Sequence, residues 1–133
     1  NVVAKSPDFY SEYQGGVIVT TRSLLANQPE KAEAFIESYL EGLNWVLDPA
    51  NEDDAKRLLG SQMPQIKPKA MTAVMNSLTS PRSGLTPSAA LLDKGMEQVI
   101  ALRSKYGNGS TPIAPLANFL DLSIYQNKLK AHR

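Results

Sequence analysis

A run of five β-branched residues, Val17-Ile18-Val19-Thr20-Thr21, constrains the fold of this chain more than any other feature. Two heavy substituents on Cβ restrict χ1 and favour extended backbone. The run follows Gly15-Gly16 and shows no polar alternation, so we predict a strand covered on both faces. We find no second convincing strand in the sequence. An unpaired strand leaves its N–H and C=O groups without partners, so this one is expected to pair with residues outside this sequence or with a copy of itself.

The remaining sequence has the spacing of helices. The longest is expected over about 29–47, where Asn27 is a suitable N-cap, Pro29 lies in the first turn and Glu30 follows it. Asp48-Pro49 ends this helix. Its apolar residues recur at steps of three and four and form one wide stripe: Ala32, Phe35, Ile36, Tyr39, Leu40, Leu43, Val46 and Leu47.

Four further helices are expected from the same kinds of signal. The first has Asn51 as its N-cap, Leu58 and Leu59 on its apolar side and Gly60 at its end, and the second has Met71, Val74, Met75 and Leu78 on one face. The third begins at Thr86-Pro87 and has an apolar face that runs to Tyr106. The fourth has Asp121 as its N-cap and Leu122, Tyr125 and Leu129 on one side. We therefore predict a mainly α fold, with about five helices plus one N-terminal β-strand, in a single domain over residues 1–133.

The composition argues against several functional classes. The chain has 14 Lys and Arg against 13 Asp and Glu, and so lacks the basic excess that is typical of nucleic-acid-binding domains. The absence of Cys removes disulfides, thiolate zinc ligands and Cys nucleophiles. The only His, His132, lies one residue from the end, where a base or a metal ligand would be poorly anchored. No phosphate-binding loop, dinucleotide fingerprint or G-x-S-x-G motif occurs, so we expect no catalytic residue, no metal and no cofactor.

Three local features each admit two interpretations. The acids Glu52-Asp53-Asp54 could suggest a hard-metal site, but the first turn of a helix explains them better. Trp45 points away from the apolar stripe of its helix, so it packs under another helix or docks on a partner. Arg103 lies inside the apolar face of its helix, where a structural role, with a snorkelling stem or a partly buried ion pair, explains it better than ligand binding does.

The segment before the predicted strand holds the candidate ligand-binding residues. Amphipathic aromatic residues in a loop that enters a buried strand could line a ligand cleft, or they could cap the edge of the core. Both interpretations stay open from the spacing alone. The candidates are Tyr10, Tyr13, Gln14, Gly15 and Gly16.

The order of these motifs is similar to that of a known family. The stretches that carry the similarity are Tyr13 to Arg22, Asn27 to Ala32, Phe35 to Asn51, Gly95 to Gly107 and Pro115 to Tyr125. In them the chain resembles the C-terminal part of the periplasmic substrate-binding proteins of ABC importers of the nitrate/sulfonate/bicarbonate (NitT/TauT) type. The resemblance extends from about Phe9 onward, and its motifs are patterns of packing and capping.

This resemblance implies a fold and a function. The chain would be a fragment of a periplasmic-binding-protein-like α/β lobe, namely the C-terminal segment of a discontinuous two-lobe protein, and its strand would complete a sheet formed by the rest. The protein would be periplasmic or otherwise extracytoplasmic. It would capture a small solute, often a nitrate- or sulfonate-like anion, and deliver it to the membrane permease subunits, with lobe closure about a hinge. The five candidate residues would lie near that hinge.

Two other functions remain as alternatives. A helical protein-interaction module that dimerises through Val17 to Thr21 would also explain the lone strand and the position of Trp45. An enzyme of the pyrimidine-synthesis type shares the family fold but uses His and Cys, and this chain has no Cys.

Overall fold

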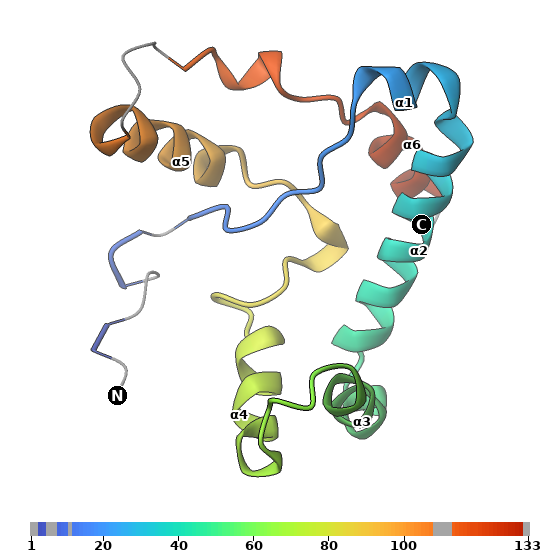
Figure 1. Ribbon diagram of the computed structural model, residues 1–133, viewed down its shortest axis with the longest axis vertical. Helices are drawn as coiled ribbons and strands as arrows, with labels where there is room; N and C mark the ends of the chain where they lie inside the picture. The colour runs from blue at the N-terminus through green and yellow to red at the C-terminus, as the bar shows by residue number, and fades with distance from the viewer. Residues whose placement is uncertain (1–2, 5–7, 11, 108–112, 132–133) are drawn as a thin grey trace. The chain divides into compact units, whose positions relative to one another are not determined.

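The structure is a computed structural model that describes residues 3–4, 8–10, 12–107 and 113–131, and these residues are mainly helical, as predicted (Figure 1). His132 and the turn-rich loop at 108–112 lie outside the described residues. The α-helices are α1 (Arg22–Asn27), α2 (Pro29–Leu47), α3 (Glu52–Gln62), α4 (Pro68–Leu78), α5 (Asp93–Tyr106) and α6 (Ser123–Ala131). Short 3-10 helices accompany them, among them η2 (Pro49–Asn51), η3 (Pro87–Ala89) and η4 (Leu116–Asn118).

The strand predicted over Val17–Thr21 is not present, and the described residues contain no other strand. Val17, Ile18 and Val19 are 49%, 53% and 81% exposed. The strand preference of β-branched residues reflects packing on a pleated surface, and no described segment offers such a surface here. Thr21 instead caps α1, because its Oγ1 accepts a hydrogen bond of 3.1 Å from the N–H of Leu24.

Helix α2 confirms the predicted long helix, although only part of its apolar stripe is covered. Helix α2 begins at Pro29, and Asn27 is the last residue of α1 rather than the N-cap of α2. Leu40 and Leu43 are the buried residues of α2. Phe35 and Tyr39 stay exposed, and their rings stack on each other with centroids 6.3 Å apart.

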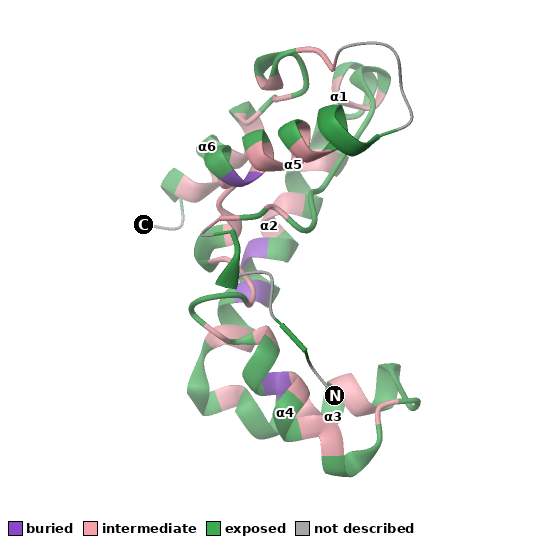
Figure 2. Cartoon of the chain, turned by 90° about the vertical axis from the view of Figure 1, so that its left-hand side faces the viewer, coloured by how far each residue is buried: buried purple, intermediate pink, exposed green. Residues whose placement is uncertain are grey.

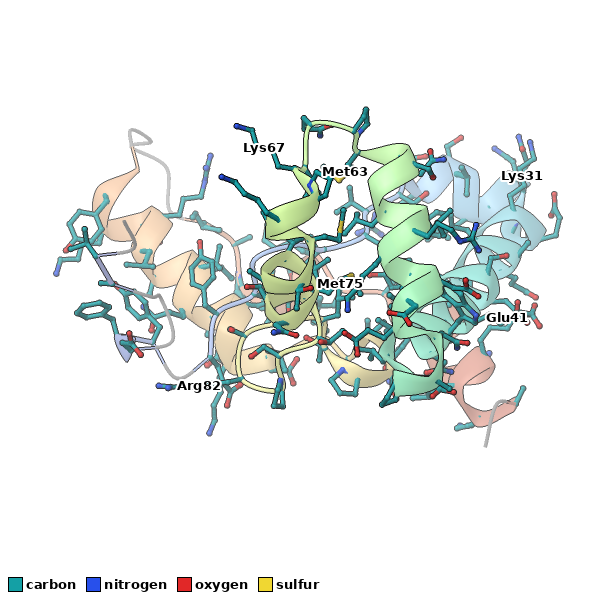
Figure 3. The ribbon with its side chains drawn as sticks, turned by 90° about the horizontal axis from the view of Figure 1, so that it is seen from below. Lys31, Glu41, Met63, Lys67, Met75 and Arg82 are labelled. Atoms are coloured by element: carbon teal, nitrogen blue, oxygen red, sulfur yellow. The ribbon has the colours of Figure 1, made fainter. Side chains whose placement is uncertain are left out.

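Helices α3 and α4 pack against each other. Gly60, expected to end α3, lies inside it, since α3 continues to Gln62. A Cβ at Gly60 would lie 3.3 Å from the terminal methyl of Met71, so the glycine lets α4 approach closely. Met75 is 2% exposed, and Figure 3 shows it between α4 and α3. Ala55 is the buried residue of α3.

Helix α5 begins later than the sequence suggested. Thr86-Pro87 opens only the short helix η3, and α5 starts at Asp93. Within η3, Ser88 and Ala89 have φ of 57° and 53°, in the left-handed region, which a continuing right-handed helix does not allow. The predictions for the end of α5 and the start of α6 are confirmed. Helix α5 ends at Tyr106, just before Gly107. Asp121 accepts hydrogen bonds from the N–H and the Oγ of Ser123, the first residue of α6.

The chain divides into two compact units, one of Asn1–Ala32 with Leu91–Arg133 and one of Glu33–Ala90. The expected single domain over 1–133 stays a prediction. Within the first unit, α5 contacts η4. The second unit holds α3 and α4 and most of α2.

Few of the described residues are buried (Figure 2), and many large apolar side chains among them are exposed. The exposed side chains include Val19 at 81%, Phe119 at 62% and Phe35 at 53%.

Candidate functional site

The Gln14 side chain ties the N-terminal segment to the start of α5, within the first unit. Its Oε1 accepts a hydrogen bond of 3.0 Å from the N–H of Leu92, the N-cap residue of α5. Its Nε2 donates a hydrogen bond of 2.6 Å to the carbonyl of Gly16. Both ends of one amide are therefore used, one to satisfy a backbone donor at the helix start and one to shape the loop.

Gly95 provides the surface on which this segment rests. It is the buried residue of α5, and a Cβ there would lie 2.8 Å from the backbone nitrogen of Gln14 and 3.2 Å from the carbonyl carbon of Tyr13. Real Cβ atoms do not approach backbone that closely, so only glycine fits without displacing the segment. Figure 1 shows the N-terminal segment running alongside α5.

A hollow opens between the residues before this contact and one face of α5. Its volume is about 430 Å³. On the segment side, Tyr10 lies beside Tyr13, with ring centroids 6.4 Å apart. On the helix side, positions three and four apart share one face. The lining residues are Phe9, Tyr10, Glu12, Lys94, Glu97, Gln98 and Ala101.

The lining of the hollow combines aromatic rings with ionised groups. Phe9 is 71% exposed and Tyr10 is 36% exposed, so both rings have uncovered area. Glu12 and Glu97 carry negative charge and Lys94 carries positive charge. None of these three groups takes part in an ion pair between described residues. The hollow can therefore offer a small polar solute ring faces, hydrogen bonds and free charges.

The five predicted site residues have different places in the structure, and only Tyr10 is among the residues that line the hollow. Tyr10 lines the hollow, and Tyr13 and Gln14 hold the segment on α5. Gly15 and Gly16 are exposed, have negative φ, and would meet nothing within 4 Å if a Cβ were added. The α5 residues of the hollow were not predicted. A glycine at position 95 inside a helix was the one local signal, because it indicates a close approach.

The acidic run Glu52-Asp53-Asp54 forms the first turn of α3, as the helix interpretation predicts. Lys56 contacts Glu52 at 2.5 Å, and this hydrogen bond raises the pKa of the Lys56 ammonium above its usual value. Arg57 contacts Asp54 at 2.9 Å. Among the described residues no group of three or more His, Asp or Glu side chains is arranged to hold a metal ion.

The two residues that break helical patterns have different surroundings. Trp45 is 38% exposed, and its carbonyl accepts a 3.0 Å hydrogen bond from Asn51 Nδ2. Arg103 is exposed and takes part in none of the ion pairs among the described residues, so the partly buried ion pair is not found.

Comparison with protein-family models, with curated protein sequences and with solved structures finds no match to this chain. Separately, none of the helices in the described ranges combines the length and the apolar character that a membrane crossing requires.

Proposed function

We propose that this chain is part of a solute-binding component of an ABC importer, with the hollow beside α5 as part of its ligand site. The observation that carries the proposal is the junction at Gly95. There the segment at Tyr13-Gln14 rests on the start of α5, and both stretches are among those that resemble the binding-protein family. A segment held in this way can present Tyr10 to a solute with little loss of conformational freedom on binding.

The uncovered apolar surface supports the proposal that the chain is one portion of a lobe. Val17 and Ile18 are half exposed and Val19 is 81% exposed, although β-branched residues are typical of buried strands. In the proposed protein these residues pair with strands that other parts of the lobe supply. That pairing would cover the exposed side chains and satisfy the backbone groups of the run.

The proposed role sets the partners and the location of the protein. A binding component of an importer works outside the cytoplasmic membrane and delivers its solute to permease subunits in that membrane. The resemblance implies that the solute is a small anion such as nitrate or a sulfonate. The proposal assigns no catalytic step and no cofactor to this chain.

One observation favours a second candidate function. The same exposed run, Val17 to Thr21, would serve a helical interaction module that dimerises by pairing two copies of the run. This candidate explains the exposed β-branched residues, but it gives no role to the hollow or to the contact at Gly95.

A titration of the full chain with small solutes tests the first proposal. The amide shifts of Lys94, Glu97 and Gln98 are followed by NMR during addition of nitrate, methanesulfonate, bicarbonate, a pyrimidine and small amines. Saturable shifts support the proposal if the binding behind them is weaker in Tyr10→Ala but not in Tyr106→Ala. The second variant is the control, since Tyr106 is an exposed tyrosine of α5 that does not line the hollow. Saturable binding to none of these solutes would reject it.

A further inference from the structure

We infer that the hollow beside α5 takes an organic ammonium cation. This inference rests on the proposed function, because it names the class of solute for the same site. It differs in sign from the anion that the family resemblance implies, and it is drawn from the chemistry of the lining residues.

The charges around the hollow favour a cation. Two carboxylates, Glu12 and Glu97, and one ammonium, that of Lys94, line it, so its described lining residues carry a net charge of −1. An anion held by Lys94 would share the hollow with two carboxylates, and repulsion between like charges disfavours its binding. A cation meets two attractive groups and one repulsive group.

The rings next to these charges favour the same ligand. The faces of Phe9 and Tyr10 carry the negative part of the aromatic quadrupole, which attracts alkylammonium groups. Phe9 is 71% exposed, so a bound alkylammonium would also remove apolar ring surface from water. A nitrate or a small sulfonate gains neither effect from a ring face.

The lining charges are available for a ligand. Lys94 and Glu97 lie one turn apart on α5, and the ion pairs among the described residues include neither of them, nor Glu12. A ligand therefore does not have to break a pair before it binds. Glu12 is only partly exposed, which reduces the screening of its charge by water.

Three solutes of similar size and different charge test the inference on the full chain. Tetramethylammonium chloride is the cation, tert-butanol the neutral compound and sodium methanesulfonate the anion, all at one ionic strength. The amide shifts of Lys94, Glu97 and Gln98 report binding. We expect saturable shifts with tetramethylammonium at concentrations where the other two produce none.

Charge-neutralising variants of opposite sign show whether the lining residues act as proposed. Glu97→Gln and Glu12→Gln should each raise the Kd for tetramethylammonium about three- to tenfold, the range expected for one partly exposed charge. Lys94→Gln should lower that Kd by a smaller factor. Glu41→Gln removes an exposed acid of α2 that does not line the hollow, and it should leave the Kd unchanged. A loss of structure would weaken binding in all hollow variants, so the opposite response of Lys94→Gln separates charge from folding.

Each outcome decides between the two proposals. Saturable binding of methanesulfonate that Lys94→Gln weakens, without binding of tetramethylammonium, overturns the cation inference and leaves the solute-binding function in place. An unchanged Kd for tetramethylammonium in both Glu12→Gln and Glu97→Gln also overturns the cation inference, because the cation then binds elsewhere. Binding of no solute, here or in the wider panel above, rejects the proposed function itself.

Discussion

The backbone N–H of Leu92 donates a hydrogen bond to Oε1 of Gln14, 3.0 Å away and 78 residues earlier in the sequence. This bond joins the N-terminal segment to the first turn of α5. Tyr10 and Glu12, which line the hollow, precede Gln14 along the same segment. The candidate site therefore lies next to the long-range contacts that Gln14 and Gly95 make.

Removal of that contact should loosen the start of α5. Gln14→Ala deletes the acceptor of a partly buried bond, which costs about 1 kcal/mol and corresponds to about fivefold faster local opening. Amide hydrogen exchange at Leu92 measures the change. Gln65→Ala alters an exposed glutamine in the second unit and is the control. Unchanged exchange at Leu92 in Gln14→Ala would show that the bond contributes nothing to the attachment of the segment.

Two glycine substitutions should change stability in opposite directions. Gly42→Ala places a methyl group where nothing lies within 4 Å on α2, so the better helix propensity of Ala should raise the free energy of unfolding by up to about 1 kcal/mol. Gly95→Ala also gains helix propensity, but its Cβ would lie 2.8 Å from the backbone nitrogen of Gln14. Overpacking costs about 1–3 kcal/mol, so a net loss is expected.

Urea unfolding followed by circular dichroism, together with amide shifts near each site, measures both glycine variants. Gly95→Ala should also shift the amides of Tyr13 and Gln14, whereas Gly42→Ala should leave them in place. Equal stabilisation by the two substitutions would contradict the close packing at Gly95.

Acid should weaken the start of α6. Hydrogen bonds from the Oγ and the N–H of Ser123 hold the pKa of the Asp121 carboxyl below its usual value of 3.8. A carboxyl whose pKa is lower in the folded state stabilises the fold fully above 3.8, and that contribution is lost as the pH falls through the lowered pKa. The first turn of α6 should therefore fray only in strong acid.

The Cα chemical shifts of residues 123–126 follow this fraying as the pH is lowered from neutral. Ser123→Ala deletes the hydroxyl donor, so the pKa of Asp121 should rise toward its usual value and the fraying should begin at a higher pH. An identical titration of Asp121 in both proteins would mean that the hydroxyl does not stabilise the carboxylate.

Local patterns in the sequence predict most of the helices correctly. The 3–4 spacing places α2 and α4, and Asp48-Pro49 correctly marks the end of α2. Some element boundaries are not visible in these patterns. Gly60 lies inside α3, where it allows the close approach of Met71, and the positive φ of Ser88 and Ala89 separates Thr86-Pro87 from the start of α5. The start of α1 is hidden in the sequence, because its N-cap, Thr21, is also the last residue of the β-branched run.

The candidate site could be predicted only on its N-terminal side. Tyr10, Tyr13 and Gln14 stand out locally as amphipathic residues between turns, and the structure gives each a place at the junction with α5. Lys94, Glu97 and Gln98 resemble any solvent-facing helical residues in sequence. Only the folded contact across about 80 residues makes them one side of a hollow, and a local pattern carries no information on such a contact.

The exposed run Val17–Thr21 should make the chain self-associate. Val19 is 81% exposed, and pairing of two copies of the run would cover it. The same pairing would give hydrogen-bond partners to the backbone groups of residues 17–19, which make no backbone hydrogen bond with other described residues. Sedimentation velocity at rising concentration should show a mass that approaches twice 14.5 kDa. Val19→Lys should abolish this association, since a charge on an unpaired edge blocks edge-to-edge pairing. Val3→Lys, at a site that is 97% exposed, adds the same charge outside the run and should not. A wild-type chain that stays monomeric at millimolar concentration would contradict pairing through this run, and equal effects of the two lysines would assign the association to charge alone.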